Sequence, residues 1–295
     1  MADQGPSWDL LADIQLLLQF HFMQNALVVG TLVALLAGAI GYFIVLRGQS
    51  FAAHMLSQVG FPGAAAGVLV HVSPVVGLIV FCIAGALGVS LAGRSVDAGR
   101  RAESSAVGSI LAFSLALGLL FFRLYAGSIQ SIYAFLFGTI LGITDLDLLV
   151  TAITTLVALA VLAVIGRPLL FASVDPDAAE ARGVPVRAIS VLFLILVALS
   201  VAETVRVIGT LLIFALLVTP GAAAQQLTAR PPLAFVLTIA LSLVFVWVGL
   251  AIAYFSLYPV GFFVTSLAFG TYLGIRIVKA VGARLPARPV LRIAQ

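Results

Sequence analysis

One polar stretch within an otherwise apolar sequence has residue types that could bind a metal ion. In residues 50–63 (SFAAHMLSQVGFPG), His54, Ser57 and Gln58 are spaced i, i+3 and i+4, so on a helix they share one face. Imidazole binds zinc, iron and other first-row metals well, whereas an amide oxygen is a weak, hard ligand. The spacing therefore indicates a metal contact at His54, with Ser57 and Gln58 as weaker partners. A histidine hydrogen-bonded to a neighbouring helix is the alternative.

The chain around this stretch has the composition of a membrane protein. Of its 295 residues, 63% are hydrophobic and 9% are charged, whereas a soluble domain carries about a quarter charged residues. A chain of this size cannot bury so much apolar surface in one water-soluble core. The net charge of +4 is modest and the basic residues are spread over loops, so nucleic acid is not an expected partner. The single cysteine, Cys82, cannot form an internal disulfide.

Apolar segments long enough to cross a bilayer recur along the chain. Because a spanning helix needs about 20 residues, they predict an all-α, polytopic membrane protein with about eight to nine transmembrane helices. Segment 128–143 is too short for a full span, and we expect a re-entrant or half helix there. The expected spans are 25–46, 51–72, 74–93, 105–122, 148–165, 188–202, 207–227, 232–255 and 260–278.

The distribution of basic residues orients these spans by the positive-inside rule. Arg94, Arg100 and Arg101 mark one cytoplasmic loop, segment 167–187 a second, and the basic tail places the C-terminus in the cytoplasm as well. These three assignments agree only if 128–143 does not cross fully. The side of the N-terminus stays open.

We expect a single membrane domain with two short flanking segments. Residues 1–24 form an N-terminal interfacial amphipathic segment, residues 25–280 the transmembrane permease domain, and residues 281–295 a basic cytoplasmic tail. The first 20 residues contain aspartates and no Lys or Arg, the reverse of a cleavable signal peptide.

The loop at 167–187 contains the signals for a short, capped helix. Asp175 is a good N-cap and Pro176 suits the first helical position. Gly183 fits the residue that ends a helix, with Pro185 shortly after it. The pattern predicts a cytoplasmic helix of about two turns. Such a helix suits the transmission of force from a soluble partner, and a surface helix without a partner is the alternative.

The same loop resembles the permeases of metal-type ABC importers, which serve zinc, manganese and iron uptake in bacteria. The matching pieces are DPDAAEARGVPVR (175–187) and VIGTLLIFALLVTPGAAA (207–224), with FMQ (22–24), FIVLR (43–47), SF (50–51), FPG (61–63) and LFGTILG (136–142) in order before them. The resemblance as a whole covers about residues 22 to 280.

The resemblance implies a permease that works by alternating access in the bacterial plasma membrane. Its expected partners are a second permease subunit, most simply a second copy of this chain, a pair of cytoplasmic ATP-binding subunits, and an extracellular metal-binding lipoprotein or periplasmic protein. The chain lacks a Gly-x-x-x-x-Gly-Lys-Ser/Thr loop, so ATP is hydrolysed on another chain and this one is not an enzyme. No permanently bound cofactor is expected, only the transported divalent metal. The implied ATPase-coupling residues are Asp175, Pro176, Ala178, Ala179, Glu180, Ala181, Arg182 and Gly183.

The candidate metal residues depart from the pattern of the family they resemble. There, Gly-Asp-Ala-Leu-Ser-His lines the metal path with its Asp and its His. Here His54 stands where the Asp falls, and Gln58 where the His falls. A site without a carboxylate holds a divalent cation less tightly. We therefore predict a weak transit site that favours zinc over manganese or iron, because manganese prefers oxygen ligands.

Other charged residues have simpler interpretations. Glu203 and Arg206 are spaced i, i+3 and are expected to form an ion pair, which as a hypothesis is also part of an outer gate. Asp145 and Asp147 are expected to cap the next span. His71 abuts an apparent extracellular turn and is expected to be solvated.

Three other functions compete with metal import. An intramembrane enzyme needs a Gly-x-Ser-x-Gly elbow, a His-Glu-x-x-His helix or paired intramembrane Asp, and the sequence has none of these. A secondary transporter would carry ionisable groups near the midplane and show repeated halves. A permease for a metal chelate, siderophore or vitamin is the nearest alternative, since such permeases also use a short coupling helix.

Overall fold

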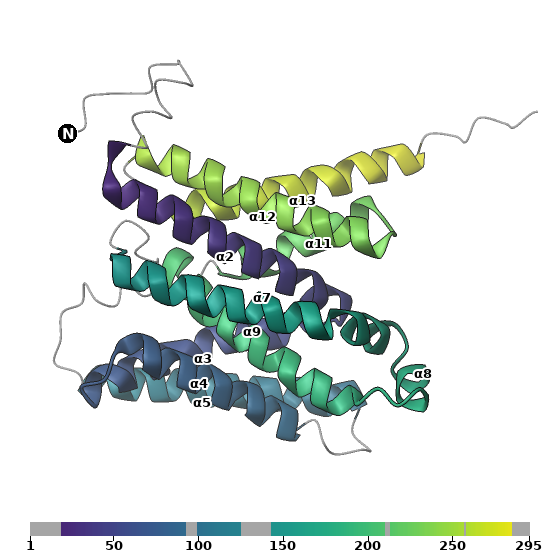
Figure 1. Cartoon of the computed structure of the whole chain (residues 1–295), viewed down its shortest axis with the longest axis horizontal. Helices are drawn as coiled ribbons and strands as arrows, with labels where there is room; N and C mark the ends of the chain where they lie inside the picture. The colour runs from purple at the N-terminus through teal and green to yellow at the C-terminus, as the bar shows by residue number, and fades with distance from the viewer. Residues whose placement is uncertain (1–18, 93–98, 125–142, 210–212, 257, 285–295) are drawn as a thin grey trace, which may run out of the picture.

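The computed structural model describes residues 19–92, 99–124, 143–209, 213–256 and 258–284 (Figure 1). All the regular structure in these ranges is helical. The helices are α2 (His21–Leu46), α3 (Ser50–Leu69), α4 (Pro74–Ala92), α5 (Gly99–Leu124), α7 (Asp145–Val174), α8 (Pro176–Ala181), α9 (Val186–Ile208), α10 (Ile213–Leu217), α11 (Thr219–Leu227), α12 (Pro231–Tyr254) and α13 (Val260–Arg284).

Within the described ranges, 6 helices are long and apolar enough to cross a membrane, namely α2, α4, α7, α9, α12 and α13. Shorter apolar stretches occupy Val107–Phe121 of α5 and Ile213–Leu227. α3 is not among the 6 because its polar residues lower its mean hydropathy. The chain is therefore an all-α, multi-pass membrane protein, as its composition predicts.

The long helices run side by side in three groups (Figure 1). α11, α12 and α13 lie on one side, α3, α4 and α5 lie on the other, and α2, α7 and α9 lie between them. Two sets of hydrogen bonds mark the ends of this bundle. Asn25 bonds to Asp145 at one end, and Arg47 bonds to Ser173 and Ser190 at the other. α2 and α7 are therefore parallel to one another, and α9 runs back in the opposite direction.

The short helix α8 lies at the Arg47 end of the bundle, where α13 also ends (Figure 1). Arg47, Arg182, Arg187 and Arg230 all lie in turns or helix starts at this end. By the positive-inside rule we expect this to be the cytoplasmic end, and we call it so below and the opposite one the outer end.

The expected span 207–227 is wrong as a single helix. α9 continues through Glu203, because this side chain is buried and hydrogen-bonded and does not end the helix. The helix ends before Gly209, whose φ is +89°. α10 and α11 then divide the remainder at Val218. Pro220, at the start of α11, has no N–H for the helix ladder, which explains the break.

Two other predictions concern segments outside the described residues. The interfacial segment, residues 1–24, is described only from residue 19, and the re-entrant segment 128–143 only at Ile143.

α5 begins near the cytoplasmic turn, where Val107 shares a cavity with Phe51, and ends at the outer end, where α7 begins.

Close backbone packing fixes α3 against α4. A Cβ added at Gly77 would lie 2.2 Å from the backbone oxygen of Gly63, so only glycine allows this approach. The small-residue stretch 63–67 (GAAAG) therefore lies at a helix contact. It positions the helix that carries His54, Ser57 and Gln58.

Candidate metal path and cytoplasmic coupling site

The predicted helix around His54 is confirmed, because α3 spans the whole polar stretch. The His54 side chain is half-buried, and its ring meets the Phe214 ring of α10 edge-on, with the centroids 5.8 Å apart and the planes at 89°. α10 is therefore the wall against which the imidazole lies. A hydrogen bond to a neighbouring helix, the alternative for this histidine, is not seen among the described residues.

Ser57 and Gln58 differ in their surroundings although their spacing places them on one face with His54. Ser57 is fully buried, and its hydroxyl donates to the backbone oxygen of His54 at 2.6 Å. Gln58 is half-buried, and within the described part of the chain its amide makes no hydrogen bond. His54 and Gln58 are thus the two groups of this face with free polar atoms.

The described residues contain no cluster of three or more His, Cys, Asp or Glu side chains that could hold a metal ion. A single copy of the described chain therefore offers one imidazole and one amide, and a closed metal cage would need more ligands than these. This arrangement is compatible with brief contact during transit.

A cavity of about 450 Å³ lies beside Phe214, between α10, α11 and α13. Most of its wall is apolar, and Thr219, Thr265 and Tyr272 add hydroxyl groups to it. Phe214 borders this cavity and also contacts the His54 ring, whereas the cavity lining itself comes from α10, α11 and α13.

The predicted short, capped helix is confirmed as α8. The Asp175 carboxylate accepts a hydrogen bond from the Ala178 backbone N–H at 3.0 Å, and Pro176 occupies the first turn. Gly183 has a φ of +81°, as its predicted helix-ending role requires. Ala179 is buried, whereas most of the other residues predicted to couple to the ATPase, Asp175, Pro176, Glu180, Ala181, Arg182 and Gly183, are exposed.

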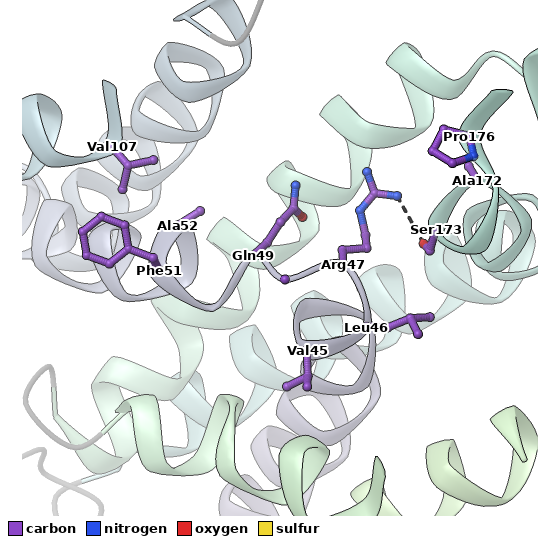
Figure 2. Close-up of a pocket in the computed structure, with 11 residues that line it drawn as sticks. Val45, Leu46, Arg47, Gln49, Phe51, Ala52, Val107, Ala172, Ser173 and Pro176 are labelled. Carbon is purple, nitrogen blue, oxygen red and sulfur yellow. Dashed lines mark hydrogen bonds between the residues drawn. The ribbon is translucent and has the colours of Figure 1, made fainter. Parts of the chain in front are cut away.

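The turn between α2 and α3 borders a second cavity, of about 560 Å³, at the cytoplasmic end (Figure 2). Arg47 points across it toward Ser173. Its Nη1 donates to Ser173 Oγ at 3.2 Å and its Nη2 to Ser190 Oγ at 2.7 Å. The sequence did not predict this cluster of Arg47, Ser173 and Ser190. Its one indication in the sequence is an arginine at the end of an expected span, just before a glycine.

Polar residues at the outer end bridge α2, α7 and α9. Glu203 is 1% exposed and accepts a hydrogen bond from Thr151 Oγ1 at 2.7 Å. The Arg206 side chain lies outside the described residues, so its ion pair with Glu203 stays a prediction.

The expected capping pair is correct for one aspartate only. Thr144 is the N-cap of α7, and Asp147 completes a capping box with it. Asp145 instead accepts a hydrogen bond from Asn25 Nδ2 at 2.8 Å. His71 is exposed in a left-handed conformation, with φ 58°, at the outer turn after α3.

The profile of the ABC 3 transport family matches residues 19–279, which include the α3 face, α8 and the Arg47 turn. The chain belongs to this family. It is 32% identical over 216 residues to the manganese transport system membrane protein MntC of Halalkalibacterium halodurans, covering 73% of each chain. It is 34% identical over 207 residues to the manganese import system permease protein ScaB of Streptococcus parasanguinis, covering 70% of this chain and 72% of that one.

The fold is similar to that of a family member of known structure. The structure described as PsaBC from Streptococcus pneumoniae in complex with Fab matches with a TM-score of 0.80 and 28% identity, over 92% of this chain and 99% of the other. The resemblance inferred from sequence is thereby confirmed. The chain is a permease subunit of an ABC importer of the manganese and zinc type, and not itself an enzyme.

Proposed function

We propose that two copies of this chain form a membrane path for a divalent transition metal, with His54 as a protein ligand near the cytoplasmic end of this path and Gln58 beside it. The observation that supports this most is the α3 face. It carries an imidazole and an amide that make no hydrogen bonds within the described residues, and the imidazole contacts Phe214, which borders a cavity, in a protein of the ABC 3 transport family. In a twofold pair, two His54 side chains would supply the ligands that one copy lacks.

Manganese and zinc are the leading cargoes, and different observations favour each. The two relatives are named for manganese. The His54 imidazole, standing where the family pattern has a carboxylate, favours zinc, and iron ranks below both. The metal passes as substrate, so weak and reversible contact at His54 serves transport better than a tight site would.

The exposed face of α8 is the proposed contact for the ATP-binding subunit. Glu180 and Arg182 are exposed, while Ala179 forms the buried face of the helix, so a charged surface is available to a partner. A pair of ATP-binding subunits would contact the two copies of α8. An extracellular metal-binding protein would deliver the ion at the outer end.

The proposal includes a membrane topology for the chain. α3 and α5 cross the membrane together with the 6 long apolar helices, which gives at least eight spans, and the C-terminus is cytoplasmic. A path lined by α3 then lies between apolar helices that face lipid. The membrane is the bacterial plasma membrane.

Transport by the complete importer in liposomes tests the proposal. The permease is assembled with its ATP-binding and metal-binding partners, and uptake of manganese, zinc and iron is measured with and without ATP. An importer with an ATP-binding subunit that cannot hydrolyse ATP is the matched control. ATP-dependent uptake of manganese or zinc is expected. Uptake of a metal chelate, with none of the free ions, would contradict the proposal and favour the chelate permease.

A further inference from the structure

Resting on the proposed function, we propose that Arg47 is the positioning residue that transmits movement of α8 to the helix of His54. One guanidinium joins three parts of the chain that are far apart in sequence. These are the end of α2, the residues just before α8, and the helix just after it (Figure 2). The steps of this connection can each be followed in the structure.

The first step is the rigid turn in which Arg47 lies. Arg47 is the C-cap of α2, and Gly48 follows with a φ of +68°. Gln49 N–H bonds to Ile44 O at 2.9 Å and Gly48 N–H to Val45 O at 3.1 Å. This pair of bonds is a Schellman motif, which fixes the direction of the chain as it leaves the helix. α3 begins at Ser50, so a shift of Arg47 moves the start of α3 directly.

The second step is the attachment of the guanidinium to both arms of the α8 loop. Ser173 is in the last turn of α7, just before Asp175, and Ser190 is in the second turn of α9. The guanidinium carbon also lies 5.6 Å from the centre of the buried Phe193 ring of α9. A planar fork bonds the two hydroxyls through two separate nitrogens while its flat face lies over the ring, a geometry that a compact ammonium group does not match. The contact therefore favours arginine over lysine.

The third step is the connection of α8 to these arms. Asp175 ends α7 and caps α8, so the two helices share a residue. On the far side, Val184 N–H bonds to Ala179 O at 3.0 Å, and the Arg182 guanidinium carbon lies 5.6 Å from the centre of the Phe171 ring of α7. α8 therefore cannot shift without moving the end of α7 or the start of α9.

The cavity of about 560 Å³ leaves room for such a shift, because it separates the α2–α3 turn from the junction of α7 and α8. Its lining includes Arg47 and Phe51 on one wall and Ser173 and Pro176 on the other (Figure 2). Arg47 is the described side chain that crosses from one wall to the other. Movement of α8 toward or away from the bundle would thus reach the start of α3 through this residue, seven positions before His54.

The test is Arg47→Lys in the complete importer, which keeps the charge and removes the fork. The expected result is retained assembly and retained ATP hydrolysis, with metal taken up per ATP hydrolysed lower by about tenfold, in the range of ordinary coupling energies. Ser190→Ala should lower the same ratio less, and adding it to Arg47→Lys should lower it no further. Arg230→Lys is the matched control, because Arg230 is an exposed arginine at the same end, and its ratio should not change.

Two results would overturn the proposal. An unchanged ratio in Arg47→Lys would show that the contact does not transmit movement. Loss of assembly, or uptake and hydrolysis falling together, would assign Arg47 to folding or to docking of the ATPase.

A readout independent of cargo separates this inference from the proposed function. Spin labels are attached at Val70, beyond the end of α3, and at Phe262 in α13, both exposed, while buried Cys82 stays unlabelled. ATP with vanadate should change the distance between the labels in the otherwise unaltered importer but not in Arg47→Lys. A change of equal size in both would contradict the role of Arg47. Absence of metal uptake in the unaltered importer would contradict only the proposed cargo.

Discussion

The turn at Arg47 and the face at His54 lie seven positions apart in the sequence and are built in opposite ways. At the turn, the guanidinium bonds to two serines and stacks on a phenylalanine, and the backbone closes the end of α2. At the face, His54 has a ring contact, and neither His54 nor Gln58 makes a hydrogen bond within the described residues. In the proposed mechanism the turn transmits force, and the face leaves its polar atoms available to a passing ion.

The contrast shows how a membrane protein can combine stiffness with weak binding. A transport site that satisfied all its polar atoms internally would give an ion nothing to bind, and a site with a full ligand cage would not release it. Packing, rather than hydrogen bonding, has to hold such a face in place. The contact between Gly63 and Gly77 performs this task for α3.

The largest effect is expected from disturbing that packing. Gly77→Ala should destabilise the permease by about 1–3 kcal/mol, because the new methyl group overlaps the Gly63 backbone. Thermal unfolding in detergent measures it as a lower Tm. Gly108→Ala is the matched control, since a Cβ there meets no atom within 4 Å. Equal Tm values for the two variants would mean that the close packing at Gly77 does not hold α3 in place.

The next effect concerns ion choice. His54→Asp combined with Gln58→His recreates the carboxylate and imidazole of the family pattern at these two positions. We expect the ratio of manganese to zinc uptake to rise about tenfold, because manganese favours oxygen ligands. Competition between the two metals in liposomes measures this ratio. An unchanged ratio would mean that the face does not select the ion.

A smaller effect is expected at α8. Asp175→Ala removes the N-cap bond to Ala178 and should cost the short helix about 1 kcal/mol. That corresponds to roughly fivefold weaker co-purification of the ATP-binding subunit, if α8 must be folded to bind it. Asp177→Ala, in the same turn without a capping bond, should weaken it less. Undiminished binding in Asp175→Ala would leave α8 without its proposed role.

The smallest effect is expected at the outer end. Thr151→Val removes the hydrogen bond to Glu203 and should cost about 0.6 kcal/mol, the average for hydrogen bonds between helices in membranes. Thr154→Val is the control, because Thr154 bonds only to Val150 of its own helix among the described residues. If the two variants lower the Tm equally, the contact between α7 and α9 adds nothing to stability.

Local patterns in the sequence were sufficient for much of this architecture. Hydropathy located most of the helices, and the spacing of Asp175, Pro176 and Gly183 predicted α8 with its caps. The helical placement of His54 also followed from sequence. These features depend on residues close together along the chain, which is why they could be predicted.

Contacts between distant segments could not be predicted in this way. Arg47 and Ser190 are 143 positions apart, and nothing in either local sequence indicates the other. The prediction that this span ends at position 202 was wrong for a related reason, because α9 continues to Ile208. Glu203 has the charge of a span boundary, but its burial against Thr151 depends on α7, 52 positions earlier.

The most direct test of the account compares metal uptake by importers carrying unaltered permease, His54→Ala or His71→Asn. His71 is the matched control, an exposed histidine at the outer turn whose left-handed backbone an asparagine can adopt. The account predicts that His54→Ala loses ATP-dependent uptake of manganese or zinc while ATP hydrolysis continues, and that His71→Asn transports normally. Full uptake by His54→Ala would contradict the placement of the metal path along α3.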